Sequence, residues 1–166
     1  MIYVECKPDF TLLKSITNIS KRGIVHEFKG KYEICKQLEK RTHCKGLIDE
    51  DPLSFQPAYV KRLRLDNDLP EHDLKVLYDS SKHNYLIVLC PRLEEWVLKV
   101  AWEAGIDVRK YDLPDHAVRL HREINIRLDK FERLLQDLKD SDKVKALRPK
   151  FNSQNSSPKL SLRPVR

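Results

Sequence analysis

The first fifty residues alternate between short apolar runs and segments with helical apolar spacing, and this alternation restricts the chain to few folds. Apolar runs occupy residues 2–4, 24–26 and 46–48, while residues 10–16 and 32–38 place apolar side chains three or four positions apart. Strands that are joined through helices run parallel, with the helices packed against the faces of the sheet. We therefore predict an α/β fold with a mostly parallel central sheet.

The remainder of the chain adds strands and helices to this pattern. Residues 60–65 alternate between apolar and charged side chains as an exposed strand does, and residues 74–78 and 85–90 form two more apolar runs. Apolar residues recur at helical spacing over 93–104 and again over 117–138. We therefore predict a three-layer, Rossmann-like arrangement that ends in one long C-terminal helix.

Charge divides the chain into a nearly neutral body and a basic end. Residues 141–166 hold seven Lys or Arg and a single acid, Asp142, so they account for six of the seven net positive charges. The apolar periodicity stops after Asp140, and residues 152–158 are rich in Asn and Ser. We predict one domain over residues 1–140 and a basic, disordered tail over 141–166. The tail either binds polyanions through salt-sensitive attraction or serves only as a solvated end.

Targeting signals and cysteine usage point to the cytoplasm. No apolar run approaches the roughly 20 residues that a helix needs to cross a bilayer. The first residues lack the basic segment and long apolar core of a signal peptide. The four cysteines are scattered without a Cys-x-x-Cys pair, which indicates reduced thiols. A zinc site made of Cys35, His43 and Cys44 is conceivable, but these residues lack the usual ligand spacing.

The clearest functional signal follows the apolar run at residues 46–48. Asp49 ends this run, Asp51 comes two residues later, and Pro52 takes the chain out of the sheet. Residues two apart on extended chain face the same side, and two carboxylates so placed repel each other unless a cation or a proton lies between them. Mg²⁺ is a cation that such a pair of carboxylates is suited to bind. The alternative interpretation is an ordinary solvated turn.

A second acid at the end of another strand favours the metal interpretation. The first apolar run ends at Glu5. In an open parallel sheet, ligands bind beyond the carboxyl ends of the strands. If the first and third strands are neighbours, Glu5 converges with Asp49 and Asp51, and one or two Mg²⁺ or Mn²⁺ ions would relieve their mutual repulsion.

Two other groups of charged residues have both a functional and a structural interpretation. Glu94 and Glu95 begin a predicted helix after the run at 85–90; Glu94 is a further metal ligand, or both acids merely complement the helix dipole. Lys29 and Lys31 lie where another helix begins and either bind a phosphate backbone or form a solvated helix face.

Three segments together resemble the Toprim domain of topoisomerases, primases and related nucleases. They are residues 3–9, with Glu5 at a strand end and Asp9 four residues later, residues 46–51, with the Asp49-Glu50-Asp51 motif, and residues 91–96. The last segment looks like an acidic motif of compact stand-alone Toprim-like proteins of prokaryotes. The resemblance covers about the first hundred residues in outline, and roughly fifteen positions carry motif identity.

The resemblance implies a Toprim-like α/β fold and a metal-dependent reaction on phosphodiesters. Glu5 would act as general acid or base, Asp49 and Asp51 would bind Mg²⁺, and Glu94 would be an additional ligand. Many Toprim sequences have Gly after the Glu, whereas this chain has Cys6. No transesterifying tyrosine can be assigned, which favours hydrolysis over rejoining.

Three functional hypotheses follow. The first is a Mg²⁺-dependent nuclease acting on DNA or RNA, with a companion ATPase as a possible partner. The second is a non-catalytic Toprim-like module that binds metal or nucleic acid. The third, less favoured, is a phosphatase with Asp49 as nucleophile, which the position of the acids after a third strand argues against.

Overall fold

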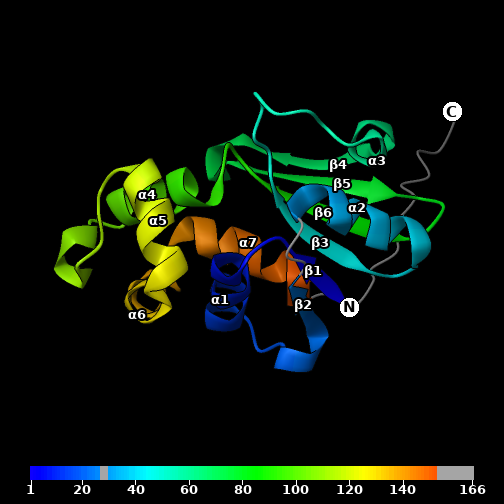
Figure 1. Cartoon of the computed structure of the whole chain (residues 1–166). Helices are drawn as coiled ribbons and strands as arrows, with labels where there is room; N and C mark the ends of the chain where they lie inside the picture. Colours follow the sequence, from blue (N-terminus) through cyan, green and yellow to red (C-terminus); the bar gives the residue numbers. More distant parts are fainter. Residues whose placement is uncertain (27–29, 153–166) are drawn as a thin grey trace, which may run out of the picture.

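The computed structural model describes residues 1–26 and 30–152 of the chain. Within them, six strands form one sheet (Figure 1). They are β1 (Ile2–Val4), β2 (Ile24–His26), β3 (Lys45–Asp49), β4 (Arg64–Leu69), β5 (Leu74–Asp79) and β6 (Asn84–Leu89).

The sheet is mostly parallel, as predicted. Its strand order is β2-β1-β3-β6-β5-β4. The first four strands in this order pair in parallel, whereas β5 runs antiparallel to both β6 and β4. The predicted neighbourhood of the first and third strands is confirmed, since Val4 of β1 pairs with Leu47 of β3. Parallel neighbours end at the same edge of the sheet, so the chain leaves β1, β3 and β6 on one side.

Helices cover both faces of the sheet. The helices of the described residues are α1 (Lys7–Ile16), α2 (Gly30–Lys40), α3 (Ala58–Arg62), α4 (Leu93–Glu103), α5 (Ala117–Ile126), α6 (Leu128–Leu138) and α7 (Asp142–Asn152), with short 3-10 turns η1 (Lys21–Gly23), η2 (Pro70–His72) and η3 (Val108–Tyr111). No helix among them combines the length and the apolar character needed to cross a membrane.

Alternate residues of the strands point into two separate cores. The larger core includes Leu47 and packs α1, α4, α5, α6 and α7 on one face. The smaller core includes Ile48 and packs α2 and α3 on the other. The α2 helix lies very close to β3, and Gly46 leaves room for this contact. A Cβ at this position would fall 3.0 Å from a methyl group of Ile34 on α2 and 2.8 Å from a methyl group of Leu86 on the neighbouring strand β6. The α/β class with helices on both faces therefore follows from strand alternation and helix amphipathicity together.

Two predicted elements differ in the structure. The predicted strand at residues 60–65 is wrong: the segment ends α3 and only then begins β4 at Arg64. Pro57 precedes α3, and its carbonyl accepts a hydrogen bond from the Lys61 amide at 3.3 Å, which closes a helical turn. The predicted long C-terminal helix is divided into α5 and α6 by Arg127, whose backbone has φ −117° and ψ 67°. The apolar stripe continues on both sides of this break, so periodicity alone did not reveal it.

The ordered fold also extends past the predicted boundary at residue 140. Residues 142–152 form α7, and its Val144, Leu147 and Phe151 are buried in the larger core. Helical spacing of these three apolar side chains was concealed by the basic residues between them. The remainder of the predicted tail, residues 153–166, lies outside the described residues.

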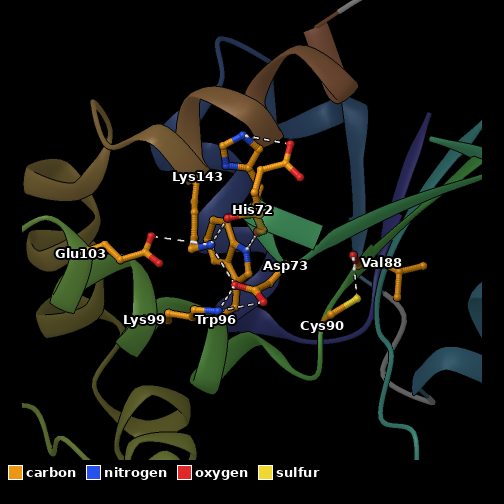
Figure 2. Close-up of polar contacts among 9 residues, drawn as sticks. His72, Asp73, Val88, Cys90, Trp96, Lys99, Glu103 and Lys143 are labelled. Carbon is orange, nitrogen blue, oxygen red and sulfur yellow. Dashed lines mark hydrogen bonds and ion pairs between the residues drawn. The ribbon is translucent and has the colours of Figure 1, made fainter. Parts of the chain in front are cut away.

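A buried lysine fastens α7 to the rest of the domain (Figure 2). The Lys143 side chain is 1% exposed, and its Nζ donates to the Glu71 carbonyl at 2.7 Å and to Asp73 Oδ2 at 2.8 Å. Glu103 of α4 approaches the same ammonium at 3.6 Å, and Lys99 of α4 also pairs with Asp73. A charge this deeply buried is stable only because its partners satisfy it.

We expect Lys143→Ala to lower the free energy of unfolding by about 3 kcal/mol, because the Asp73 carboxylate and the Glu71 carbonyl lose their buried partner. Urea denaturation followed by circular dichroism measures this change. Lys145→Ala is the matched control, since Lys145 belongs to the same helix but is exposed. Equal stability of the two variants would show that the Lys143 contacts contribute nothing.

Candidate active site at the carboxyl edge of the sheet

Acidic side chains from several elements meet where β1, β3 and β6 end. Glu5 directly follows β1, Asp49 is the last residue of β3, and Glu94 stands in the first turn of α4, just after β6. Asp9 adds a fourth carboxyl group from the first turn of α1. We refer to Glu5, Asp9, Asp49 and Glu94 as the acid cluster. Electrostatic interactions within it couple Asp49 to Asp9, Glu5 and Glu94.

Glu5 links three elements through main-chain hydrogen bonds. Its Oε1 accepts from the Asp49 amide at 3.0 Å, and its Oε2 accepts from the Lys31 amide in the first turn of α2 at 3.1 Å. Gly30 precedes Lys31 with φ +71°, a conformation that favours glycine. Burial raises the pKa of Glu5, and these amides and the Lys31 charge oppose that rise.

Asp49 is held by the start of α4. Its Oδ1 accepts from the Leu93 amide at 2.9 Å, and Leu93 is the first residue of that helix. The partial positive charge of a helix N-terminus favours the carboxylate form. Burial nevertheless dominates, followed by the charges of Asp9 and Glu5, and the pKa of Asp49 rises to about 9. The side chain predicted to bind metal is therefore the most strongly perturbed carboxyl group in the cluster.

Asp9 is the site residue that the sequence analysis left unassigned. The amide and the thiol of Cys6 both donate to its Oδ2, each at 3.1 Å. Burial and the charge of Glu5 raise the pKa of Asp9 to about 7. The available signal was its position four residues after Glu5, but Asp9 also fits the pattern of an acid that stabilises the first turn of a helix. Cys6 thus supports Asp9 through both its amide and its thiol.

Glu94 joins the cluster from the side of α4 and α5. The side chain is buried, and its Oε1 lies 2.6 Å from Nδ1 of His121 on α5. A pocket of about 230 Å³ opens beside this pair, with Arg92 and Arg122 among its lining residues. Both interpretations of Glu94 therefore stay open, because it lies in a first helical turn and also interacts electrostatically with Asp49.

Asp51 lies nearby, but not for the predicted reason. Its φ of +42° is left-handed, so the chain is not extended there and the period-two argument does not hold. The Asp51 amide donates to the Pro91 carbonyl at 2.8 Å, which anchors this turn against the segment after β6. The charge of Asp51 acts on Glu5 and raises its pKa. Asp51 is thus close enough to the acid cluster to interact electrostatically with Glu5.

Lys31 contributes to the loop that follows β3. Its Nζ donates to the Glu50 carbonyl at 2.9 Å and to Gln56 Oε1 at 3.3 Å. Its predicted role in binding nucleic acid stays a prediction. Lys29, which we predicted to act beside it, lies outside the described residues.

The donor set of the acid cluster suits a hard cation. All four side chains offer oxygen, and among the described hydrogen bonds Asp9, Asp49 and Glu94 each use only one carboxylate oxygen. Burial first, and then the neighbouring carboxylates, raise the pKa values of Asp9 and Asp49, so a bound cation would favour their ionised forms. In the described part of the chain, no three His, Cys, Asp or Glu side chains are arranged to hold one ion, around Asp49 or around the cysteines. Binding would therefore require carboxylates to rotate.

Comparison of the chain with protein-family models, curated proteins and solved structures found no match in any of the three. The interpretation of the site accordingly rests on its own residues.

We expect the metal-free protein to lose stability as the pH rises. Asp9 has an ordinary pKa of 3.8 and a raised value of about 7 in the folded chain. Between these values the folded state binds more protons than the unfolded state, so the free energy of unfolding falls with increasing pH. Chemical denaturation with a chelator present, repeated at several pH values, measures this slope.

The Asp49→Asn variant tests whether the acid cluster, rather than other titrating groups, causes this dependence of stability on pH. The amide oxygen can still accept from Leu93, while one of the repelling charges is gone. At pH 8 the free energy of unfolding of the variant should exceed that of the parent by about 1 kcal/mol or more. This free energy should also depend less on pH in the variant. Parallel pH profiles for parent and variant would contradict the assignment of the slope to this cluster.

Proposed function

We propose that this protein is a Mg²⁺- or Mn²⁺-dependent phosphodiesterase of the Toprim type that hydrolyses DNA or RNA. The observation that supports this proposal most is the convergence of Glu5, Asp9, Asp49 and Glu94 at the carboxyl edge of parallel strands. This edge is the usual ligand site of an open α/β sheet. The motif residues that carry the Toprim resemblance supply three of these side chains, Glu5, Asp9 and Asp49, and the acidic segment after β6 supplies Glu94.

The roles of the residues follow from their surroundings. Asp49, Asp51 and Glu94 would hold the metal ion, which would polarise a phosphate oxygen and activate water when bound. Glu5 would exchange a proton with the attacking water or the leaving oxygen. Burial raises its pKa toward the range in which a carboxyl group serves as general acid or base near neutral pH. The two amides that bind Glu5 fix the direction of its carboxyl group.

A non-catalytic Toprim-like module is the alternative. The observation that favours it is that both oxygens of Glu5 already accept main-chain hydrogen bonds, which reduces its freedom to move a proton. In this version the acid cluster binds metal or nucleic acid without cleavage. A companion ATPase stays a prediction for either version.

We expect Asp49→Asn to lower Mg²⁺- or Mn²⁺-dependent cleavage of nucleic acid by about 100-fold or more, a loss typical of removing one group that acts directly on the reaction. Cleavage of end-labelled single-stranded and duplex DNA and RNA, resolved by gel electrophoresis, measures the rate. Asp140→Asn is the control, because Asp140 is an exposed acid on the helical side of the molecule.

A thermal shift on adding Mn²⁺ gives an independent readout of metal binding. The parent should gain stability and Asp49→Asn should gain much less. Metal binding without cleavage of any substrate would replace the enzyme with the non-catalytic alternative. Undiminished cleavage by Asp49→Asn would reject the proposed site.

A further inference from the structure

The loop between β3 and α3, residues 50–57, presents two large apolar side chains to solvent. Leu53 is 99% exposed and Phe55 is 80% exposed. In Figure 1 this loop stands out from the body of the domain, beside the edge where β3 ends. The loop begins at Glu50, directly after Asp49, so its exposed side chains lie within a few residues of the acid cluster in the sequence. We call residues 50–57 the Phe55 loop.

The loop is held in place by its own hydrogen bonds. The Gln56 amide nitrogen donates to the carbonyls of Glu50 and Asp51, both at 3.1 Å, and to the Ser54 carbonyl at 3.2 Å. Ser54 donates its amide and its hydroxyl to the Asp51 carbonyl. The Lys31 ammonium secures the same turn from α2. These hydrogen bonds give the backbone of the Phe55 loop a defined turn, from which the Phe55 side chain extends into solvent.

A cationic group lies against the exposed ring. The Lys61 ammonium lies 4.9 Å from the centroid of Phe55, and within the described residues it has no carboxylate partner. A flat apolar ring beside an ammonium that has no carboxylate partner among the described residues matches a ligand that combines flat bases with phosphates.

We propose that the Phe55 loop is a stacking platform for an unpaired base of single-stranded nucleic acid. This inference rests on the proposed function and narrows its substrate class. An unpaired base offers a free face to the Phe55 ring, whereas the bases inside a duplex are already stacked on their neighbours. Lys61 contacts the phosphate of the same nucleotide. Lys31, which binds both Glu5 and the loop, keeps the platform at a constant position relative to the acid cluster.

Binding without cleavage tests the proposal. Fluorescence anisotropy with a labelled oligothymidylate, with a chelator present, measures the affinity of the full chain for a single strand. Phe55→Ala should weaken this binding by about tenfold, while affinity for a blunt duplex of the same length changes by less than about twofold. Phe55→Trp should restore the single-strand affinity. Lys61→Gln should weaken binding and flatten its dependence on salt concentration.

The chain offers a matched control for this experiment. Trp102, near the end of α4, is also 80% exposed but lies at the opposite end of that helix from Glu94. Trp102→Ala should leave single-strand binding unchanged. Because Phe55 is exposed, the melting temperatures of the variants should equal that of the parent, which excludes misfolding as the cause of a lost affinity.

The possible outcomes separate this inference from the proposed function. Parent-like single-strand binding by Phe55→Ala overturns the inference, and an equal loss for single strand and duplex does so as well. A shift in the monomer–dimer equilibrium of Phe55→Ala without a change in binding assigns the loop to self-association instead. If Asp49→Asn cuts as well as the parent while Phe55→Ala still loses single-strand affinity, the nuclease proposal fails and the platform stands.

Discussion

Burying carboxylates beside one another is the constraint around which this domain is arranged. Glu5 and Asp49 are both partly buried, and each accepts a hydrogen bond from a main-chain N–H group at the start of a helix, α2 for Glu5 and α4 for Asp49. Helix beginnings carry unpaired amides and partial positive charge, which makes them suitable partners for acids. The bond between the Asp49 amide and Glu5 also ties the end of β3 to the end of β1. The same hydrogen bonds therefore connect the elements of the fold and position the carboxylates of the candidate site.

Those amides reduce the electrostatic repulsion but do not remove it. Even with its bond to Leu93, Asp49 has a raised pKa, and so has Asp9 with its two bonds to Cys6. Neutral donors orient a carboxylate and lower its energy, whereas full compensation of several charges needs a proton or a cation. The combination of burial and neighbouring carboxylates distinguishes this edge of the sheet from an ordinary set of helix caps.

Apolar runs predicted the central sheet well, because strands buried on both faces leave a strong signal in the sequence. The meeting of Glu5 and Asp49 followed from the same signal, since parallel neighbours end at one edge. The sequence did not reveal the left-handed turn at Asp51, which depends on a bond to the distant Pro91 carbonyl. Asp9 was recognised as part of the Toprim-like motif but was given no role, because its spacing suits a helix start as well as a site.

The errors near the C-terminus have a common physical origin. A lysine is normally expected at the protein surface. Lys143 is instead buried against Asp73 and the Glu71 carbonyl, which lie about seventy positions away in the sequence. Long-range pairing of this kind cannot be inferred from local pattern. The many basic residues of α7 likewise led to the prediction of a disordered tail. The helix is nevertheless packed into the larger core through apolar side chains such as Leu147 and Phe151.

The position of α7 has a consequence for biosynthesis. Arg148 donates to the Ile16 carbonyl of α1 at 2.6 Å, and Lys45 of β3 donates to the Lys150 carbonyl at 2.8 Å, so α7 closes onto elements that precede it by more than a hundred positions. The larger core is incomplete until Phe151 has emerged. Until α7 has been synthesised, the nascent chain therefore keeps part of this apolar surface exposed, which favours aggregation.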